Sequence, residues 1–179
     1  TVKIDINNPS KIGDKLSITK TFNTGEKFDF SQFDYEVPLG QSGLKAFASA
    51  SRLEFEIGKE LKTNPVSLGN ADTYEVGIKY PIQRTNNQSV FLRTSIEKKE
   101  IYNETTGVLT NDKTLENAKI GFDFEGKNIF QESSLTGVSV SGIFGDLDLS
   151  KVNSDYLNDQ RAKGPKTHGD FNKVVLDFY

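Results

Sequence analysis

Hydrophobic and polar residues alternate along most of the chain, in runs that turn residues interrupt. The pattern is clearest over residues 33–57, where Phe33, Tyr35 and Val37 alternate with acidic residues and the alternation resumes after a short turn. Because successive side chains of a strand point to opposite faces, each arm of this segment is predicted to be a strand with one apolar and one charged face.

The same alternation predicts about nine strands in the whole chain and no convincing helix. The strands are expected at residues 2–6, 15–22, 27–39, 44–58, 73–82, 89–101, 115–126, 134–144 and 171–179. The phase of the alternation slips between Phe30 and Phe33, which suggests a β-bulge there.

The connections between these strands are alternately short and long. They are short after Leu39, Ile82 and Gly126, and long over residues 59–72, 102–114 and 145–170. Outer-membrane barrels alternate in this way, with short periplasmic turns and long external loops. Seven of the nine predicted strands, all but those at residues 2–6 and 15–22, also cover the ~9–11 residues that a tilted strand needs to cross a bilayer. The pattern favours an all-β, antiparallel, up-and-down transmembrane barrel, although a soluble β-sandwich would explain the alternation itself equally well.

In a barrel, the charged faces of the strands are expected to line the lumen, where charges of mixed sign pair across strands and hold water. The residues predicted to face the lumen are Asp34, Glu36, Arg52, Glu54, Glu56, Glu75, Lys79, Arg93, Glu97, Asp123 and Glu125. In a soluble sheet the same residues would form the solvated face, and neither interpretation makes them catalytic.

Composition narrows the possible functions further. The 179-residue chain has a net charge of −3, so it lacks the basic field that suggests nucleic-acid binding. It contains no cysteine, which excludes disulfides and thiolate chemistry within the chain. No run approaches the ~20 apolar residues of a membrane helix, but strands with only alternate apolar residues escape that test.

Candidate catalytic and metal-binding residues are few. His168 is the only histidine and has no cysteine to share a zinc site. Asp146, Asp148, Asp155 and Asp159 do not follow the spacing of a calcium loop, so an exposed acidic loop is expected there. No nucleophile elbow or phosphate-binding glycine motif is present. The chain is therefore not expected to be an enzyme or to hold a cofactor or metal.

Short motifs in the chain resemble, in order, those of the two-partner secretion transporters of the bacterial outer membrane. Residues 8–14 read Asn-Pro-Ser-Lys-Ile-Gly-Asp, like the Asn-Pro-x-x-x-Gly-Asp opening of that barrel. Residues 35–40 resemble the first Tyr-x-x-Pro-Leu-Gly turn of the family, and residues 80–84 its second, Tyr-Pro-Leu/Ile-x-Arg. Residues 95–99 resemble the following strand, and residues 145–149 with 169–173 resemble a later strand end and restart.

The resemblance implies a fold, a location and a function. The family has two periplasmic POTRA domains followed by a sixteen-stranded barrel, and it secretes one large adhesin or haemolysin without using nucleotide. Residues 1–179 are therefore expected to be part of that barrel without a POTRA domain, in the outer membrane of a Gram-negative bacterium. The implied partners are the secreted polypeptide, outer-membrane lipid and the remaining strands of the barrel. The implied periplasmic turns contain Pro38, Leu39, Gly40, Pro81, Ile82 and Arg84.

Two other functions remain open at this stage. One is a soluble β-sandwich for adhesion or carbohydrate binding, and the other is a small structural or porin-like barrel. The later Val-Arg-Gly-Tyr/Phe-Arg loop motif of the transporter family has no counterpart in this chain.

Overall fold

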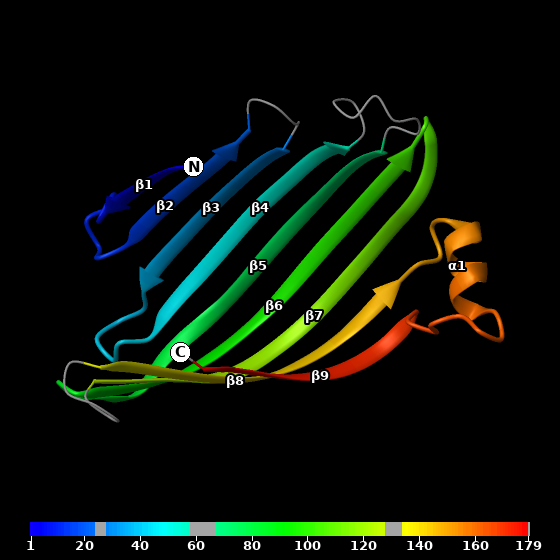
Figure 1. Ribbon diagram of the computed structural model, residues 1–179. Coiled ribbons are helices and arrows are strands. Elements are labelled where there is room, and N and C mark those ends of the chain that lie inside the picture. Colours follow the sequence, from blue (N-terminus) through cyan, green and yellow to red (C-terminus); the bar gives the residue numbers. More distant parts are fainter. Residues whose placement is uncertain (24–27, 58–66, 128–133, 179) are drawn as a thin grey trace.

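The computed structural model describes residues 1–23, 28–57, 67–127 and 134–178. The described residues form one antiparallel sheet of nine strands, ordered β1 to β9 as in the sequence (Figure 1). The strands are β1 (Val2–Asn7), β2 (Lys15–Phe22), β3 (Phe28–Pro38), β4 (Lys45–Ile57), β5 (Ser67–Arg84), β6 (Gln88–Thr105), β7 (Val108–Lys127), β8 (Leu135–Asp148) and β9 (Gly169–Phe178). A short helix, α1 (Asn153–Gln160), lies between β8 and β9. The prediction of nine antiparallel, up-and-down strands is confirmed.

The sheet is strongly curved but open. Figure 1 shows it curling so that β8 and β9 turn beneath the middle strands. Of the nine strands described, β1 pairs with β2 and β9 pairs with β8, and these two edge strands do not pair with each other. The nine strands therefore do not form the small closed barrel that was one of the alternatives.

Strand register assigns every side chain to one of two faces, because directly opposite residues of an antiparallel pair share a face. One face, here called the apolar face, is covered with large hydrophobic side chains that are exposed, such as Ile96 at 63% and Phe122 at 51%. It also carries Val2, Ile4, Ile6, Ile18, Phe33, Tyr74, Val76, Ile78, Tyr80, Ile120, Val140, Phe144, Val174, Leu176 and Phe178.

No second layer covers the apolar face in the part of the chain that is described. Leu149 and Val152 are the buried hydrophobic residues among these residues, and both lie after the end of β8. A soluble sandwich would bury one face of each sheet, so the sandwich alternative is wrong. A continuous exposed apolar face of this size fits contact with lipid.

The apolar face changes character near the end of the sheet that is farthest from the β3–β4 turn. There it carries a charged rim made of Lys20, Asp29, Arg52, Glu54, Asp72, Lys98, Glu100 and Glu116. Lys20 pairs with Asp29, Arg52 with Glu54 at 2.6 Å, and Lys98 with Glu100 at 2.9 Å. At the same level the opposite face becomes apolar, with Phe30 opposite Leu53 and Phe28 opposite Phe55.

Several strands are longer than predicted. β5, β6 and β7 contain 18, 18 and 20 residues, more than the ~9–11 that cross a bilayer. The long connection predicted over residues 102–114 is wrong, because β6 and β7 continue to a turn at Thr106 and Gly107. Both turn residues have positive φ, 53° and 77°, as a tight two-residue hairpin turn requires.

Two other sequence predictions were wrong. The pairing of β3 with β4 is regular from Phe28 to Pro38, without the bulge expected between Phe30 and Phe33. The irregularities instead lie between Pro81 and Gln83 and between Asn103 and Glu104. Helix α1 was not predicted, because its sequence Asn-Ser-Asp-Tyr-Leu-Asn-Asp-Gln has no apolar stripe. No helix among the described residues is both long and apolar enough to span a membrane.

Candidate functional site

The face opposite the apolar face, here called the polar face, holds most of the residues predicted to face the lumen. Asp34, Glu36, Glu75, Lys79, Arg93, Glu97, Asp123 and Glu125 all lie on it. Arg52, Glu54 and Glu56 lie on the apolar face instead, in or next to the charged rim. Their assignment to the same face as Asp34 and Glu36 was wrong.

The register explains this error. Asp34 pairs with Ser49 and Glu36 with Phe47, so even-numbered residues of β3 share a face with odd-numbered residues of β4. Arg52 is even-numbered and points the other way. Both strands exchange their polar and apolar faces near the charged rim, so charge alone does not identify the polar face.

Two carboxylates at the centre of the polar face are stabilised by their neighbours. Glu75 and Glu97 lie directly opposite each other on β5 and β6. Lys119 Nζ lies 2.6 Å from Glu97 Oε2 and 3.8 Å from Glu75 Oε1. The Ser95 hydroxyl donates to Glu75 at 2.6 Å and the Asn117 amide donates to Glu97 at 2.9 Å. These contacts let two carboxylates lie side by side despite their like charge.

Other carboxylates of the polar face are also hydrogen-bonded across strands. The Ser49 hydroxyl donates to Asp34 at 2.7 Å, and Ser139 donates to Asp123 at 2.7 Å. The Lys45 ammonium donates to Glu36 at 2.7 Å. The polar face is thus a wall of hydrogen-bonded polar side chains, which suits a water-filled passage.

Two cations of the polar face contact aromatic rings. Lys79 Nζ lies 4.0 Å from the centroid of the Phe91 ring, and Arg93 Cζ lies 4.7 Å from that of Phe47. Lys79 and Arg93 are direct cross-strand partners, and Lys79 is also opposite Lys45. Three cations therefore form a row across β4, β5 and β6.

The β1–β2 turn is organised around the buried carboxylate of Asp14, which is 2% exposed. It accepts hydrogen bonds from the Ser10 backbone at 3.2 Å and from the Tyr35 hydroxyl at 2.7 Å. The Gly13 backbone donates to Asn8 Oδ1 at 2.6 Å. Burial of Asp14 opposes its ionisation, but the bonds from Tyr35 and Ser10 outweigh burial and hold the pKa of the carboxyl below its usual value.

The three motif segments at this end of the sheet contact each other. A Cβ added to Gly13 would lie 3.4 Å from Pro38 Cγ, and one added to Gly43 would lie 2.8 Å from Pro81 Cγ. Each glycine therefore lets a turn lie against the proline of the next motif. Leu39 and Gly40 lie in the turn after β3, but Pro38, predicted in the same turn, is the last residue of β3. Pro81, Ile82 and Arg84 likewise belong to the end of β5, and the turn consists of residues 85–87.

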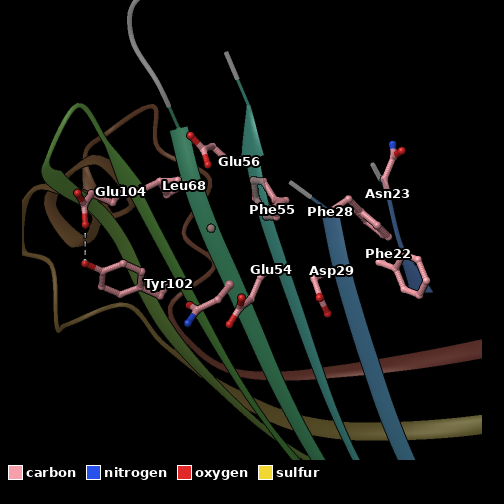
Figure 2. A pocket seen from close by; sticks show the side chains of 12 residues that line it. Phe22, Asn23, Phe28, Asp29, Glu54, Phe55, Glu56, Leu68, Tyr102 and Glu104 are labelled. Atoms are coloured by element: carbon pink, nitrogen blue, oxygen red, sulfur yellow. Dashed lines mark hydrogen bonds between the residues drawn. The ribbon is translucent and has the colours of Figure 1, made fainter. Parts of the chain in front are cut away.

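A hollow of about 440 Å³ lies at the opposite end of the sheet, near the charged rim. Figure 2 shows Tyr102 and Glu104 at one side and Phe22 and Phe28 at the other. The Tyr102 hydroxyl donates to Glu104 at 3.0 Å. The described lining residues are aromatic, aliphatic, amide and acidic, with no basic group among them.

The β8–β9 connection folds around a second buried carboxylate. Asp159 is 4% exposed, so the prediction of an exposed acidic loop is wrong at this residue. It accepts bonds from Thr167 Oγ1 at 2.7 Å, from the Thr167 and His168 backbones at 2.9 and 3.1 Å, and from Gln160 at 2.8 Å. Burial would raise the pKa of Asp159, but these bonds lower it to about 2.

His168 is a structural residue of the same connection. Its Nδ1 accepts a hydrogen bond from the Leu149 backbone at 3.2 Å, and its ring packs edge-on to Tyr156 with centroids 5.0 Å apart. Within residues 1–23, 28–57, 67–127 and 134–178, no group of three or more histidine or acidic side chains could hold a metal ion.

Sequence reasoning missed the neutral partners of the polar face, above all Ser95, Asn117 and Phe47. They are ordinary residue types, and they become notable only through the cross-strand pairs that bring them to Glu75, Glu97 and Arg93. The available signal was their alternation with apolar neighbours, which places them on the polar face but does not pair them.

Comparisons with known proteins agree with one another. A family model described as haemolysin secretion/activation protein ShlB/FhaC/HecB matches residues 1–141. No curated protein sequence is similar enough to the chain to count as a match.

Two solved structures have the same fold. CdiB from Escherichia coli matches with a TM-score of 0.67 and 15% identity, over 97% of this chain and 32% of that one. CdiB from Acinetobacter baumannii matches with a TM-score of 0.59 and 14% identity, over 81% of this chain and 30% of that one. The chain therefore spans about a third of the length of these two proteins.

Proposed function

The chain belongs to the haemolysin secretion/activation family ShlB/FhaC/HecB, and from this premise we propose that it forms part of a pore that moves a large partner polypeptide to the cell surface. Members of this family are outer-membrane β-barrel transporters of Gram-negative bacteria. The outer membrane is therefore the location of this chain.

The observation that carries the proposal is the contrast between the two faces of the sheet. One face is exposed and apolar from Tyr74 to Tyr80 on β5, which suits lipid. The other carries carboxylates that are already hydrogen-bonded, such as Glu75, Glu97 and Asp123. An unfolded polypeptide could slide along such a wall without adhering to apolar surface.

The charged rim sets the proposed position in the bilayer. A lysine or arginine facing lipid costs about 2–4 kcal/mol at the bilayer midplane and little at the interface. Lys20, Arg52 and Lys98 therefore lie beyond the hydrocarbon, and the long strands β5–β7 extend past it. The end of the sheet that carries the β3–β4 turn, with Leu39 and Gly40, is here called the turn end. In the proposed orientation the turn end faces the periplasm, and α1 lies outside the cell.

The remaining strands of the barrel are supplied by protein outside this chain. An open sheet edge is not stable in lipid, because its backbone groups would be unpaired. The exposed edges of β1 and β9 therefore pair with further strands. Transport itself is passive and uses no catalytic group of this chain.

The orientation of the two faces can be tested by cysteine labelling, because the chain has no cysteine of its own. Ser51→Cys and Ser141→Cys place a thiol on the polar face, while Ala50→Cys and Val140→Cys place one on the apolar face next to them. In outer membranes of cells that express the full-length protein, a water-soluble maleimide is expected to label the first pair only. Equal labelling of all four, or the reverse pattern, would contradict the proposed lumen.

Secretion is tested by deleting the gene. One large polypeptide is expected to disappear from the cell surface and medium and to remain in the periplasm until the gene is restored. An unchanged set of surface and medium proteins would exclude the transport function.

A further inference from the structure

The row of three cations on the polar face is electrostatically unfavourable. Lys45, Lys79 and Arg93 are direct cross-strand neighbours on β4, β5 and β6. Like charges directly opposite each other destabilise a sheet unless something compensates them. Whether this row is compensated depends on which groups contact each of the three cations.

Only Lys45 in this row has an acidic partner among the described residues, the Glu36 carboxylate at 2.7 Å. Lys79 and Arg93 lie against the rings of Phe91 and Phe47. An aromatic ring attracts a cation and fixes its position, but it does not cancel the charge. Two fixed, uncompensated positive charges thus lie side by side on the wall.

The acidic pair on the same face shows that this sheet can supply partners to two like charges. Glu75 and Glu97 are also opposite each other, yet Lys119, Ser95 and Asn117 all contact them. The acidic pair thus has a lysine within 3.8 Å of both carboxylates, whereas Lys79 and Arg93 have no acidic partner among the described residues, which leaves their two charges open.

The position of Arg93 depends on a three-layer stack. Phe47 lies opposite Gly77, and a Cβ at Gly77 would be 2.6 Å from Phe47 Cζ. The absence of a side chain therefore lets the ring lie flat against the strand, with the Arg93 guanidinium above it. Arg93 also lines a groove of about 360 Å³ in which Glu36 and Asp34 are already bonded to Lys45 and Ser49.

We propose that Lys79 and Arg93 form a binding site for acidic segments of the polypeptide in transit. This inference rests on the proposed transport function. Carboxylate side chains complement the two open charges, and charge-assisted bonds to arginine and lysine are the strong ones. Under the proposed orientation the site lies in the periplasmic half of the lumen, so an arriving acidic segment meets it early.

The test measures the ion current through the full-length protein in a planar lipid bilayer, and how strongly a short poly-glutamate peptide blocks that current. Replacing both cations, Lys79→Gln with Arg93→Gln, is expected to weaken the block roughly tenfold or more. The matched control, Lys20→Gln with Lys98→Gln, removes the same charge from the charged rim on the opposite face. The peptide is expected to block this variant as strongly as the wild type. Phe47→Leu, which keeps both charges but removes the ring below Arg93, is expected to give an intermediate block.

Each other outcome has a definite meaning. Equal block of the wild type and the Lys79/Arg93 variant, or block by poly-glutamine as strong as by poly-glutamate, would overturn the site. A loss of block in the rim variant equal to that in the Lys79/Arg93 variant would also overturn it. In all three cases the pore and secretion of the partner persist. A protein that gives no pore and no secretion would instead refute the proposed function, and the site with it.

Discussion

The β1–β2 turn and the β8–β9 connection each fold around a buried aspartate, but they differ in how far its contacts reach. Asp14 binds the backbone of its own turn and also the hydroxyl of Tyr35 on β3. The partners of Asp159 all lie within residues 160–168. The Asp14 carboxylate bonds a turn to the sheet, whereas the Asp159 carboxylate bonds residues of one connection to each other.

This difference indicates how the two ends of the sheet tolerate change. At the turn end, Gly13 contacts Pro38 and Gly43 contacts Pro81, so the turns support one another. At the loop end, α1 touches the sheet only at β7 among the described elements. We expect changes at the turn end to affect the whole sheet and changes in the connection to remain local.

The largest effect is expected for Asp14→Ala. It removes the acceptor of the Tyr35 hydroxyl and of the Ser10 amide, and leaving these partly buried donors unpaired costs stability. Unfolding of the full-length protein in detergent, followed by heat-modified mobility on gels, is expected to be roughly tenfold faster or more. Wild-type unfolding kinetics would show that the Asp14 contacts do not hold the sheet.

The next effect distinguishes two glycines of one turn. Gly40 and Gly43 both have positive φ, 73° and 81°, but only a Cβ on Gly43 would meet Pro81. Gly40→Ala is expected to cost about 1–2 kcal/mol from backbone strain alone. Gly43→Ala adds an overpacking cost of about 1–3 kcal/mol. Chemical denaturation measures both, and equal losses would mean that the turns do not support each other.

The sequence predicted the strands well where the apolar face is hydrophobic, and poorly beyond the charged rim. Hydrophobic alternation located β1 to β9, but the end of β6 consists of Asn103, Glu104 and Thr105, which are all polar, so its extension gave no alternation signal. The turn at Thr106 and Gly107 depends on positive φ at both residues, which only its glycine suggested.

The candidate site was predicted by residue type but not by partner. A period of two says which residues of a strand share a face, but it does not align that strand with the next. For this reason Arg52, Glu54 and Glu56 were assigned to the wrong face of the sheet, whereas Glu75 was assigned to the same face as Asp34, where the register places it. The pairing of Ser95 with Glu75 depends on register across strands, which local pattern does not carry.

A local effect is expected for Asp159→Asn. An amide keeps one acceptor oxygen but directs an N–H toward the donors of Thr167 and His168. Hydrogen exchange at these two amides is expected to be roughly tenfold faster, because their charged acceptor is lost. Global unfolding is expected to stay at the wild-type value. A fall in global stability as large as that of Asp14→Ala would contradict the expectation that changes in the β8–β9 connection remain local.

Acid should have the same local effect on the wild type. The pKa of Asp159 is about 2, below its ordinary 3.8. Because folding lowers this pKa, the ionised carboxylate stabilises the connection above about pH 4, and this contribution is lost as the pH falls toward 2. Protection of the Thr167 amide is therefore expected to fall across that interval. In Asp159→Asn the protection should not depend on pH there, and a parallel fall would point to another group.

The smallest effect is expected where the connection meets the sheet. Lys113 Nζ on β7 lies 3.5 Å from Asp155 Oδ2 of α1, with side chains 27% and 24% exposed. Partly exposed pairs contribute about 0–1 kcal/mol, so Lys113→Gln should barely change unfolding. Because this pair joins α1 to β7, amides of α1 should nevertheless exchange faster while Thr167 stays protected. Lys151→Gln, which breaks the 3.0 Å pair with Asp112 before the helix begins, is the matched control. If Lys113→Gln exposed Thr167 as well, the connection would depend on the sheet just as the β1–β2 turn does.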